Sequence, residues 1–120
     1  MRDIFLIGAG AIGAGAALIH GYLTQRVLVK QACDPAVFAA QPLRRLTAIL
    51  LQFSTFNWFA GGIALILAAE MGIEARRAIS LFVGINYGFA VIGNAWATDG
   101  RHIGWVVYAI SLILIILSWR

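Results

Sequence analysis

Charged residues are scarce in this chain: they make up 12% of its 120 residues, while 62% of the residues are hydrophobic. Ordinary soluble domains are about 25% charged and roughly 45–50% apolar. A chain this apolar has too few polar groups to cover a folded surface in water, so it needs lipid as part of its solvent. The scarcity of charge therefore excludes an ordinary soluble domain and predicts an integral membrane protein with the lipid bilayer as its first partner.

Cysteine and clustered charge are also missing. Cys33 is the single cysteine, which excludes an internal disulfide, and no Cys/His cluster has the spacing of a zinc finger. The net charge of +4 is spread over connecting segments, so no nucleic-acid-binding patch is predicted. No serine has a histidine at a spacing that would activate it as a nucleophile. These absences indicate a protein that is not an enzyme, with no predicted cofactor and no nucleic-acid partner.

Four apolar segments have the length of a membrane-spanning helix, which needs about 20 mostly apolar residues. They cover residues 4–23, 46–69, 78–97 and 103–119. The second, third and fourth segments are joined by short linkers, so consecutive helices are expected to be antiparallel neighbours. The sequence therefore predicts one all-α domain over residues 1–120, a bundle of four transmembrane helices. We expect a multi-pass protein of the cell membrane, and specifically of a bacterial inner membrane.

The ends of these segments carry the charges and several aromatic rings. Near the ends lie residues typical of an interfacial aromatic belt: Trp96, Trp105, Tyr108 and Trp119. The Lys and Arg residues divide four against five between the two sides: Arg2, Arg76, Arg77 and Arg120 against Arg26, Lys30, Arg44, Arg45 and Arg101. This balance leaves the orientation open and permits dual insertion with an antiparallel dimer. In the long first linker, Asp34 and Pro35 predict the start of a short interfacial helix over 35–41 that Pro42 ends.

Glycine spacing has two interpretations. Residues 8–13 read G-x-G-x-x-G after an apolar run, which is the outline of a dinucleotide-binding turn. No further strands follow to build the parallel sheet that such a site requires. Small residues four apart instead favour close helix packing, and three glycines are the expected packing positions: Gly13, Gly84 and Gly88.

Uncharged polar residues gather in the second and third predicted helices: Gln52, Ser54, Thr55, Asn57, Asn86 and Asn94. They serve either as interhelical hydrogen-bonding groups or as the lining of a polar cavity for a small substrate or ion. No Asp, Glu, Lys or Arg lies inside a predicted span, which argues against a proton-driven exporter.

Two histidines form the candidate metal site. His20 ends the first predicted helix and His102 begins the fourth, so a four-pass topology puts both at one face of the membrane. Such a pair suits a metal ion or haem, with two separate interfacial histidines as the alternative.

Two resemblances rest on short patterns. The first is carried by His20 with Leu23 and Arg26, Ser54 with Trp58, and Arg101-His102 with Trp105. This set resembles a group of small uncharacterised bacterial membrane proteins with four predicted helices, which implies the fold but no activity that can be named. Where that group often has Gly-Glu and Trp-His, this chain has Thr24-Gln25 and Leu51-Gln52.

The second resemblance is carried by residues 53–56, Phe-Ser-Thr-Phe, and by the glycine-rich residues 10–14. They are similar to segments of the small fluoride channels, which implies a four-helix channel and suits a dual-topology dimer. In those channels the phenylalanine segment belongs to the third helix, and an arginine stands where this chain has Ala17.

Three functional hypotheses follow from these patterns. The first is a non-enzymatic accessory subunit of a larger membrane complex, or a homo-oligomeric, self-associating membrane component. The second is a small transporter or channel with a polar cavity between the second and third helices. The third is a haem- or metal-binding membrane subunit.

Overall fold

The computed structural model describes residues 2–37 and 39–119. Most of these residues are helical, and none of them forms a β-strand. The chain begins with α1 (Arg2–Leu23), which continues without a break through the π-helical stretch η1 (Thr24–Val29) into α2 (Lys30–Ala32). Three further helices follow: α3 (Gln41–Ala68), α4 (Ile73–Ala97) and α5 (Gly104–Leu117). The prediction of an all-α protein is confirmed.

Among the described residues, three helices are long and apolar enough to cross a membrane: Arg2–Ala32, Gln41–Ala68 and Ile73–Ala97. The helix α5 has 14 residues, which at 1.5 Å per residue span about 21 Å. Large apolar side chains cover the outside of the molecule, including Phe53, Phe56, Phe82, Phe89, Ile92 and Ile113. A surface of this kind is stable in lipid and aggregates in water.

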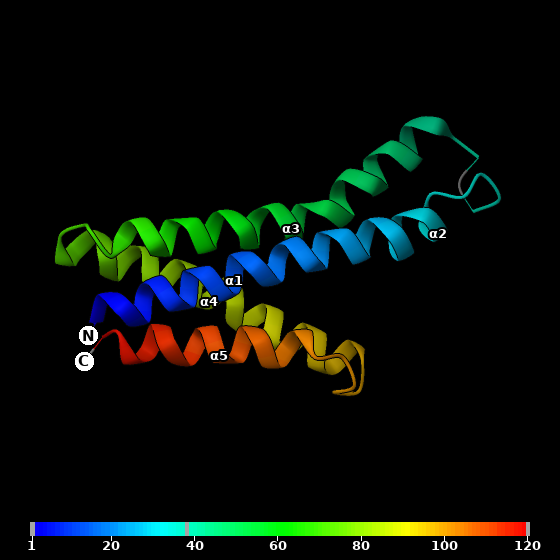
Figure 1. Ribbon diagram of the computed structural model, residues 1–120. Helices are drawn as coiled ribbons and strands as arrows, with labels where there is room; N and C mark the ends of the chain where they lie inside the picture. The colour runs from blue at the N-terminus through cyan, green and yellow to red at the C-terminus, as the bar shows by residue number, and fades with distance from the viewer. Residues whose placement is uncertain (1, 38, 120) are drawn as a thin grey trace.

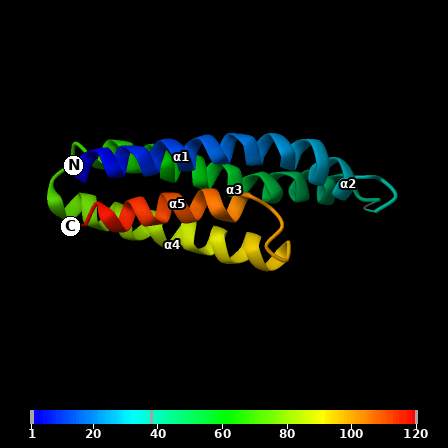
Figure 2. The same ribbon diagram turned by 60° about the horizontal axis from the view of Figure 1, so that its bottom comes forward.

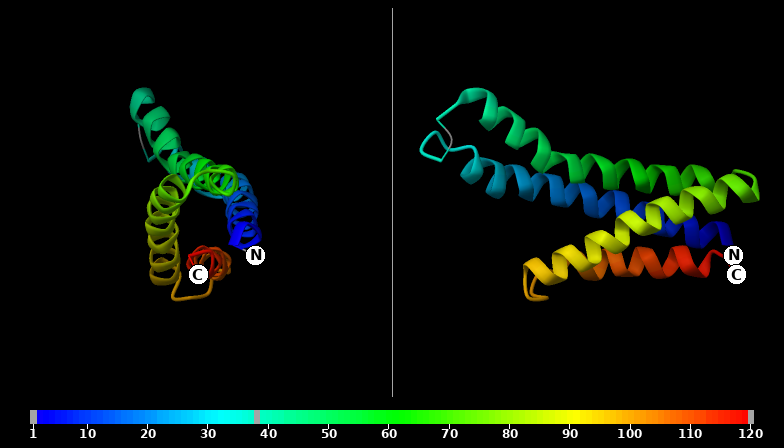
Figure 3. Two further views of the ribbon diagram at one scale, coloured as in Figure 1. Left: turned by 90° about the vertical axis from the view of Figure 1, so that its left-hand side faces the viewer. Right: turned by 180° about the vertical axis from the view of Figure 1, so that it is seen from behind.

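The helices are arranged side by side in an elongated bundle. In Figure 1 the α1–α2 helix runs beside α3, and both extend beyond the rest of the bundle at the end farthest from the termini. In Figure 2 the N-terminus and C-terminus lie at the same end, with α5 lying along α4. In the end view on the left of Figure 3, α1, α3, α4 and α5 surround a shared interior, and the view on the right shows α4 crossing the others at an angle.

The tightest packing joins α1 to α3. A Cβ atom on Gly62 would lie 2.6 Å from the Gly10 carbonyl oxygen and 2.7 Å from the Ala14 backbone nitrogen. A Cβ atom on Gly21 would overlap the Thr55 side chain in the same way. Glycine at these positions therefore lets the two backbones approach each other, as small residues do in membrane helix pairs.

The interior holds both aromatic and aliphatic side chains. Leu6, Leu65 and Val83 are buried between the helices, together with the rings of Tyr87 and Tyr108. Tyr108 was expected in the interfacial aromatic belt, and that prediction is wrong, because α5 turns its ring inward, where it is 2% exposed. Trp96 and Trp119 are exposed, as a belt residue would be.

The helix boundaries differ from the predicted spans. The first helix extends nine residues past Leu23, because polar residues such as Arg26 mark the edge of the apolar segment without breaking a helix. The helix α3 begins at Gln41, five residues before the second predicted span. The helix α4 begins at Ile73, also before the third predicted span. The first three spans therefore belong to longer helices, whereas α5 (Gly104–Leu117) is shorter than the predicted span 103–119.

The predicted short helix over 35–41 is wrong in its described part, and Phe38 lies outside the described residues. Residues 35–37 form a turn, in which Asp34 Oδ1 accepts a hydrogen bond of 2.7 Å from the Ala36 backbone N–H. Pro42 lies in the first turn of α3, where a proline is tolerated because that turn needs no N–H donor. It helps to begin α3 instead of ending an earlier helix.

An ion pair closes the end of the bundle near the chain termini. Arg76, in the first turns of α4, lies 2.7 Å from the Asp3 carboxylate at the start of α1. The Arg76 guanidinium also donates a hydrogen bond to the Ala69 carbonyl in the turn between α3 and α4. Arg120, one of the charges counted for orientation, lies outside the described residues.

Candidate functional sites

His20 lies at the junction of α1 and α3, on the side of the bundle away from the termini. Its Nε2 atom is 3.2 Å from Ser54 Oγ and 3.2 Å from Thr24 Oγ1. Its ring packs against Trp58 with a centroid distance of 4.7 Å. Three residues that carry the first resemblance, His20, Ser54 and Trp58, are therefore neighbours in space.

A column of aromatic rings continues from His20 into the bundle. Trp58 packs against Tyr108 at 4.8 Å, and Tyr108 packs against Tyr87 at 5.0 Å. The Tyr87 hydroxyl donates a hydrogen bond of 3.1 Å to the Trp58 carbonyl. Gly13 makes room for this hydroxyl, because a Cβ there would overlap it. The structure thus places Gly13, a predicted helix-packing position, against an aromatic side chain from α4.

The loop between α4 and α5 folds back and places His102 beside α5. Asp99 and Gly100 both have positive φ, which turns the chain sharply after α4. The Gly104 N–H donates a hydrogen bond of 3.0 Å to His102 Nδ1, and a Cβ on Gly104 would lie 2.7 Å from the same atom. The Trp105 indole N–H donates to the Gly100 carbonyl at 3.0 Å. Glycine at 104 therefore lets the His102 ring lie over the first turn of α5.

His20 and His102 line one cavity of about 90 Å³ between α1, α4 and α5. Asn94 and Tyr108 supply its other polar side chains, and the remaining walls are aliphatic: Ala16, Ile19, Leu23 and Ile103. Asn94 donates one hydrogen bond of 2.7 Å to the Ala90 carbonyl of its own helix. The two histidines named by the sequence are thus brought to the same cavity, together with Asn94 from the predicted polar cluster.

The cavity does not have the donor set of a metal site. No group of three or more His, Cys, Asp or Glu residues that could hold a metal ion occurs in the described part of the chain. His102 Nδ1 accepts the Gly104 N–H, so the proton of a neutral imidazole lies on Nε2, which is then a hydrogen-bond donor and not a metal ligand. A porphyrin is also much larger than a cavity of about 90 Å³.

Three amide members of the predicted polar cluster, Asn57, Asn86 and Gln52, form hydrogen bonds between helices. Asn57 Nδ2 donates a hydrogen bond of 2.8 Å to Asn86 Oδ1, joining α3 to α4. Gln52 Nε2 donates to the Gly21 carbonyl and to Gln25 Oε1, joining α3 to the first helix. Thr55 is packed against Gly21, and its hydroxyl has no partner among the described residues. These amides act as links between helices.

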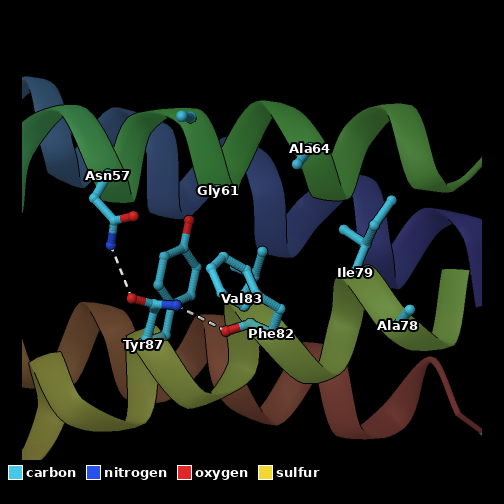
Figure 4. Close-up of a pocket in the computed structure, with 10 residues that line it drawn as sticks. Asn57, Gly61, Ala64, Ala78, Ile79, Phe82, Val83 and Tyr87 are labelled. Carbon is cyan, nitrogen blue, oxygen red and sulfur yellow. Dashed lines mark hydrogen bonds between the residues drawn. The ribbon is translucent and has the colours of Figure 1, made fainter. Parts of the chain in front are cut away.

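An open groove separates α3 from α4. Its volume is about 400 Å³, and its lining is apolar apart from Asn57 and Asn86 at one end. Figure 4 shows Gly61 and Ala64 on α3 across from Ile79 and Val83 on α4, with the amide pair beside Tyr87. One hypothesis from the sequence was a polar cavity between these two helices. The groove lies between the same helices and includes Asn57 and Asn86, but most of its lining is apolar.

The glycines of α4 face the other side of that helix. A Cβ on Gly84 would lie 3.7 Å from Leu112 of α5, and one on Gly88 would lie 4.0 Å from the same residue, both in ordinary contact range. Gly84 lies in a shallow pocket between α4 and α5 with Ser80. These two glycines thus lie on the α4–α5 contact without the close backbone approach seen at Gly62.

The glycine motif of residues 8–13 lies wholly within α1, and no strand precedes it. The apolar run before it, residues 4–7, is helical as well. The strand and turn of a dinucleotide-binding site are therefore absent from this part of the chain. Comparison of the chain with protein-family models, with curated proteins and with solved structures found no match.

Proposed function

We propose that this chain is a four-span integral membrane protein without enzymatic activity, whose copies associate with each other through the groove between α3 and α4. The groove carries the proposal, because it is a recess of about 400 Å³ in a surface that three apolar helices already assign to lipid. The accessory-subunit hypothesis differs only in the partner that fills the same recess.

The fourth span rests on the position of α5. It lies between α1 and α4, both of which are long enough to cross a membrane, and its outward side chains Ile110, Ile113 and Ile116 are exposed. A helix of about 21 Å is shorter than the hydrocarbon layer of about 30 Å, and flanking residues or local thinning make up the difference. Its exposed isoleucines are more stable in lipid than in water.

Small side chains make the groove suitable for another helix. Ala60, Gly61 and Ala64 form one wall and Ala78 begins the other, so a helix entering the groove meets little steric resistance. Membrane helices associate through such surfaces by close van der Waals packing. No charged side chain lines the groove, so a partner needs only apolar residues at the contact.

A second copy of the chain fits these requirements. Phe82 lines the groove and is exposed, and Phe56 of α3 and Phe89 of α4 are exposed as well. In a two-fold arrangement the groove of each copy receives apolar side chains from the same faces of the other. The near-equal division of Lys and Arg also permits the antiparallel form of such a dimer.

The test is the mass of the purified protein in mild detergent, compared between Ala60→Trp and Ala11→Trp. Both alanines are exposed and helical, but only Ala60 lines the groove. We expect the wild type and Ala11→Trp to be dimers, and Ala60→Trp to be monomeric at the same concentration because its indole fills the recess. A monomeric wild type, or two variants with the same mass, would contradict self-association, and a co-purifying second protein would favour the accessory-subunit form.

A further inference from the structure

Positive charge is concentrated on two helical arms that extend past the rest of the bundle. The arms are residues 24–32, at the end of the first helix, and residues 41–45, at the start of α3, and Figure 1 shows them at the end farthest from the termini. We refer to these two stretches as the basic arms. They carry four cations: Arg26, Lys30, Arg44 and Arg45. The turn between the arms adds a single carboxylate, Asp34, so most of this charge is uncompensated.

The opposite end of the molecule has no such excess. Its cations are accompanied by three carboxylates: Asp3, Glu70 and Glu74. One of them, Asp3, lies 2.7 Å from the Arg76 guanidinium. The Lys and Arg residues divide almost equally between the two ends, but the acidic residues do not. An anionic partner is therefore expected at the basic arms.

The basic arms begin at the depth of the lipid headgroups. A hydrocarbon layer of about 30 Å corresponds to about 20 residues of helix. Counted from Arg2 this distance ends near Tyr22, and counted back from Ala68 along α3 it ends near Ala48. Arg26 and Arg45 are a further turn along, about 5–6 Å, and the headgroup layer on each side is about 5–8 Å thick. Both guanidinium groups therefore belong among the headgroups.

The cations of the arms are available to a partner. Arg26, Lys30 and Arg45 are exposed, and none of the three forms an ion pair with a described residue. Arg26 lies over the Tyr22 ring, with 5.2 Å from its guanidinium carbon to the ring centroid, which keeps it near the boundary of the hydrocarbon. Arg44 is half-buried and donates a hydrogen bond of 3.0 Å to the Ala39 carbonyl, so its contribution is charge.

Apolar side chains lie among these cations. Val27, Leu28 and Leu43 are between 44% and 48% exposed. Such a surface is unfavourable in water, where a soluble acidic protein or a nucleic acid would meet it. Exposed aliphatic side chains mixed with cations are typical of helices at the boundary between headgroups and acyl chains. The pattern therefore favours lipid as the partner.

We propose that the basic arms bind the headgroups of anionic phospholipids at one face of the membrane, with Arg26 and Arg45 contacting lipid phosphate. A phosphate oxygen accepts charge-assisted hydrogen bonds from a guanidinium. Each Lys or Arg near an anionic lipid surface strengthens the attraction about fivefold. This inference uses the membrane location of the chain, but it depends neither on the α3–α4 groove nor on self-association.

The test counts phospholipids bound to the full chain in mild detergent by native mass spectrometry. Dioleoylphosphatidylglycerol, which has a net negative charge, is compared with dioleoylphosphatidylcholine, which has the same acyl chains and no net charge. We expect the first anionic lipid to bind at least about tenfold tighter, since two cations contact it. This preference should shrink as the concentration of ammonium acetate is raised, because salt screens exposed charges. Equal binding of the two lipids, or a preference that salt does not change, would overturn the proposal.

Charge-removing variants then locate the site. The double variant Arg26→Gln, Arg45→Gln is expected to reduce the preference for the anionic lipid at least about fivefold. The control Arg2→Gln, Arg77→Gln removes the same charge from the opposite end and should change the preference less than about twofold, because that end lies several Debye lengths away.

A third variant works in the opposite direction. Asp34→Asn keeps the Oδ1 acceptor for the Ala36 N–H while it removes the one carboxylate beside the arms. It should raise the preference about two- to fivefold, and it repeats the test should the arm variant fail to fold. Equal effects of the two double variants, or an unchanged preference in the folded arm and Asp34 variants, would overturn the proposal and leave a soluble acidic protein as the alternative partner.

Discussion

Replacing Gly62 with alanine tests whether the close approach of α1 and α3 holds the bundle together. The added Cβ would lie 2.6 Å from the Gly10 carbonyl oxygen and 2.8 Å from the Ala14 Cβ. Ordinary contact begins near 3.4 Å, so the helices must separate by about 0.8 Å at this point. A gap of this size removes about a quarter to a half of the dispersion energy of each affected contact.

The expected magnitude comes from a comparison with Gly15→Ala in α1. A Cβ on Gly15 has no atom within 4 Å, so that variant gains only the helix propensity of alanine, about 1 kcal/mol. The same gain occurs at Gly62, and the difference between the two variants isolates the steric cost. Overpacking of one methyl group costs about 1–3 kcal/mol. We therefore expect Gly62→Ala to be about 2 kcal/mol less stable than Gly15→Ala, roughly a thirtyfold difference in the folded-to-unfolded ratio.

The assay is equilibrium unfolding of the purified protein in mild detergent titrated with dodecyl sulfate. Trp58 fluorescence follows the transition, because this side chain is buried between the helices. Equal unfolding midpoints for the two variants would refute the reasoning, since they would show that α1 and α3 separate without loss of stability.

Two smaller predictions use the same titration. Asn57→Leu is expected to lower the free energy of unfolding by about 1–2 kcal/mol, because the Asn86 carbonyl loses its interhelical donor. The double variant with Asn86→Leu should cost less than the sum of the two single changes. Additive costs would contradict a direct bond between the two amides. Asp3→Asn is expected to cost at most about 1 kcal/mol, because the Asp3 side chain of this ion pair with Arg76 is 56% exposed. Its effect should disappear at high salt, and a salt-independent loss would argue against the ion pair.

The helical class and the position of the apolar segments could be predicted from the sequence, because hydrophobic length is a one-dimensional property. The ends of the helices could not. Arg26 and Lys30 mark the limit of the apolar run, yet their long side chains suit a helix, and nothing between Leu23 and Ala32 breaks one. Pro42 was expected to end a helix, but a proline also suits the first turn of one, and the sequence alone did not distinguish the two.

The pairing of side chains depends on helix rotation, which spacing along a single helix does not fix. Asn57 and Asn86 were both assigned to the polar cluster, and the structure adds that they bond to each other. Spacing also gave no sign that Gly10 and Gly62 form the closest contact while Gly84 and Gly88 face α5 at ordinary distance. The predicted four-pass topology placed His20 and His102 at the same membrane face. In the structure both line one cavity, because the loop at residues 98–103 folds back toward the bundle.

The π-helical stretch in the first helix has a consequence for how this chain tolerates changes in length. Buried residues along α1 recur every three or four positions up to Thr24, and the next is Val29, five positions later. A π-helical turn contains one residue more than an α-helical turn, so the stretch corrects a phase slip of one residue and keeps Val29 on the buried side of the helix. Deletion of a single residue from this stretch would restore α-helical winding without rotating Lys30–Ala32 about the helix axis. A deletion in the regular turns around Gly13 would instead turn every later side chain of the first helix by about 100°.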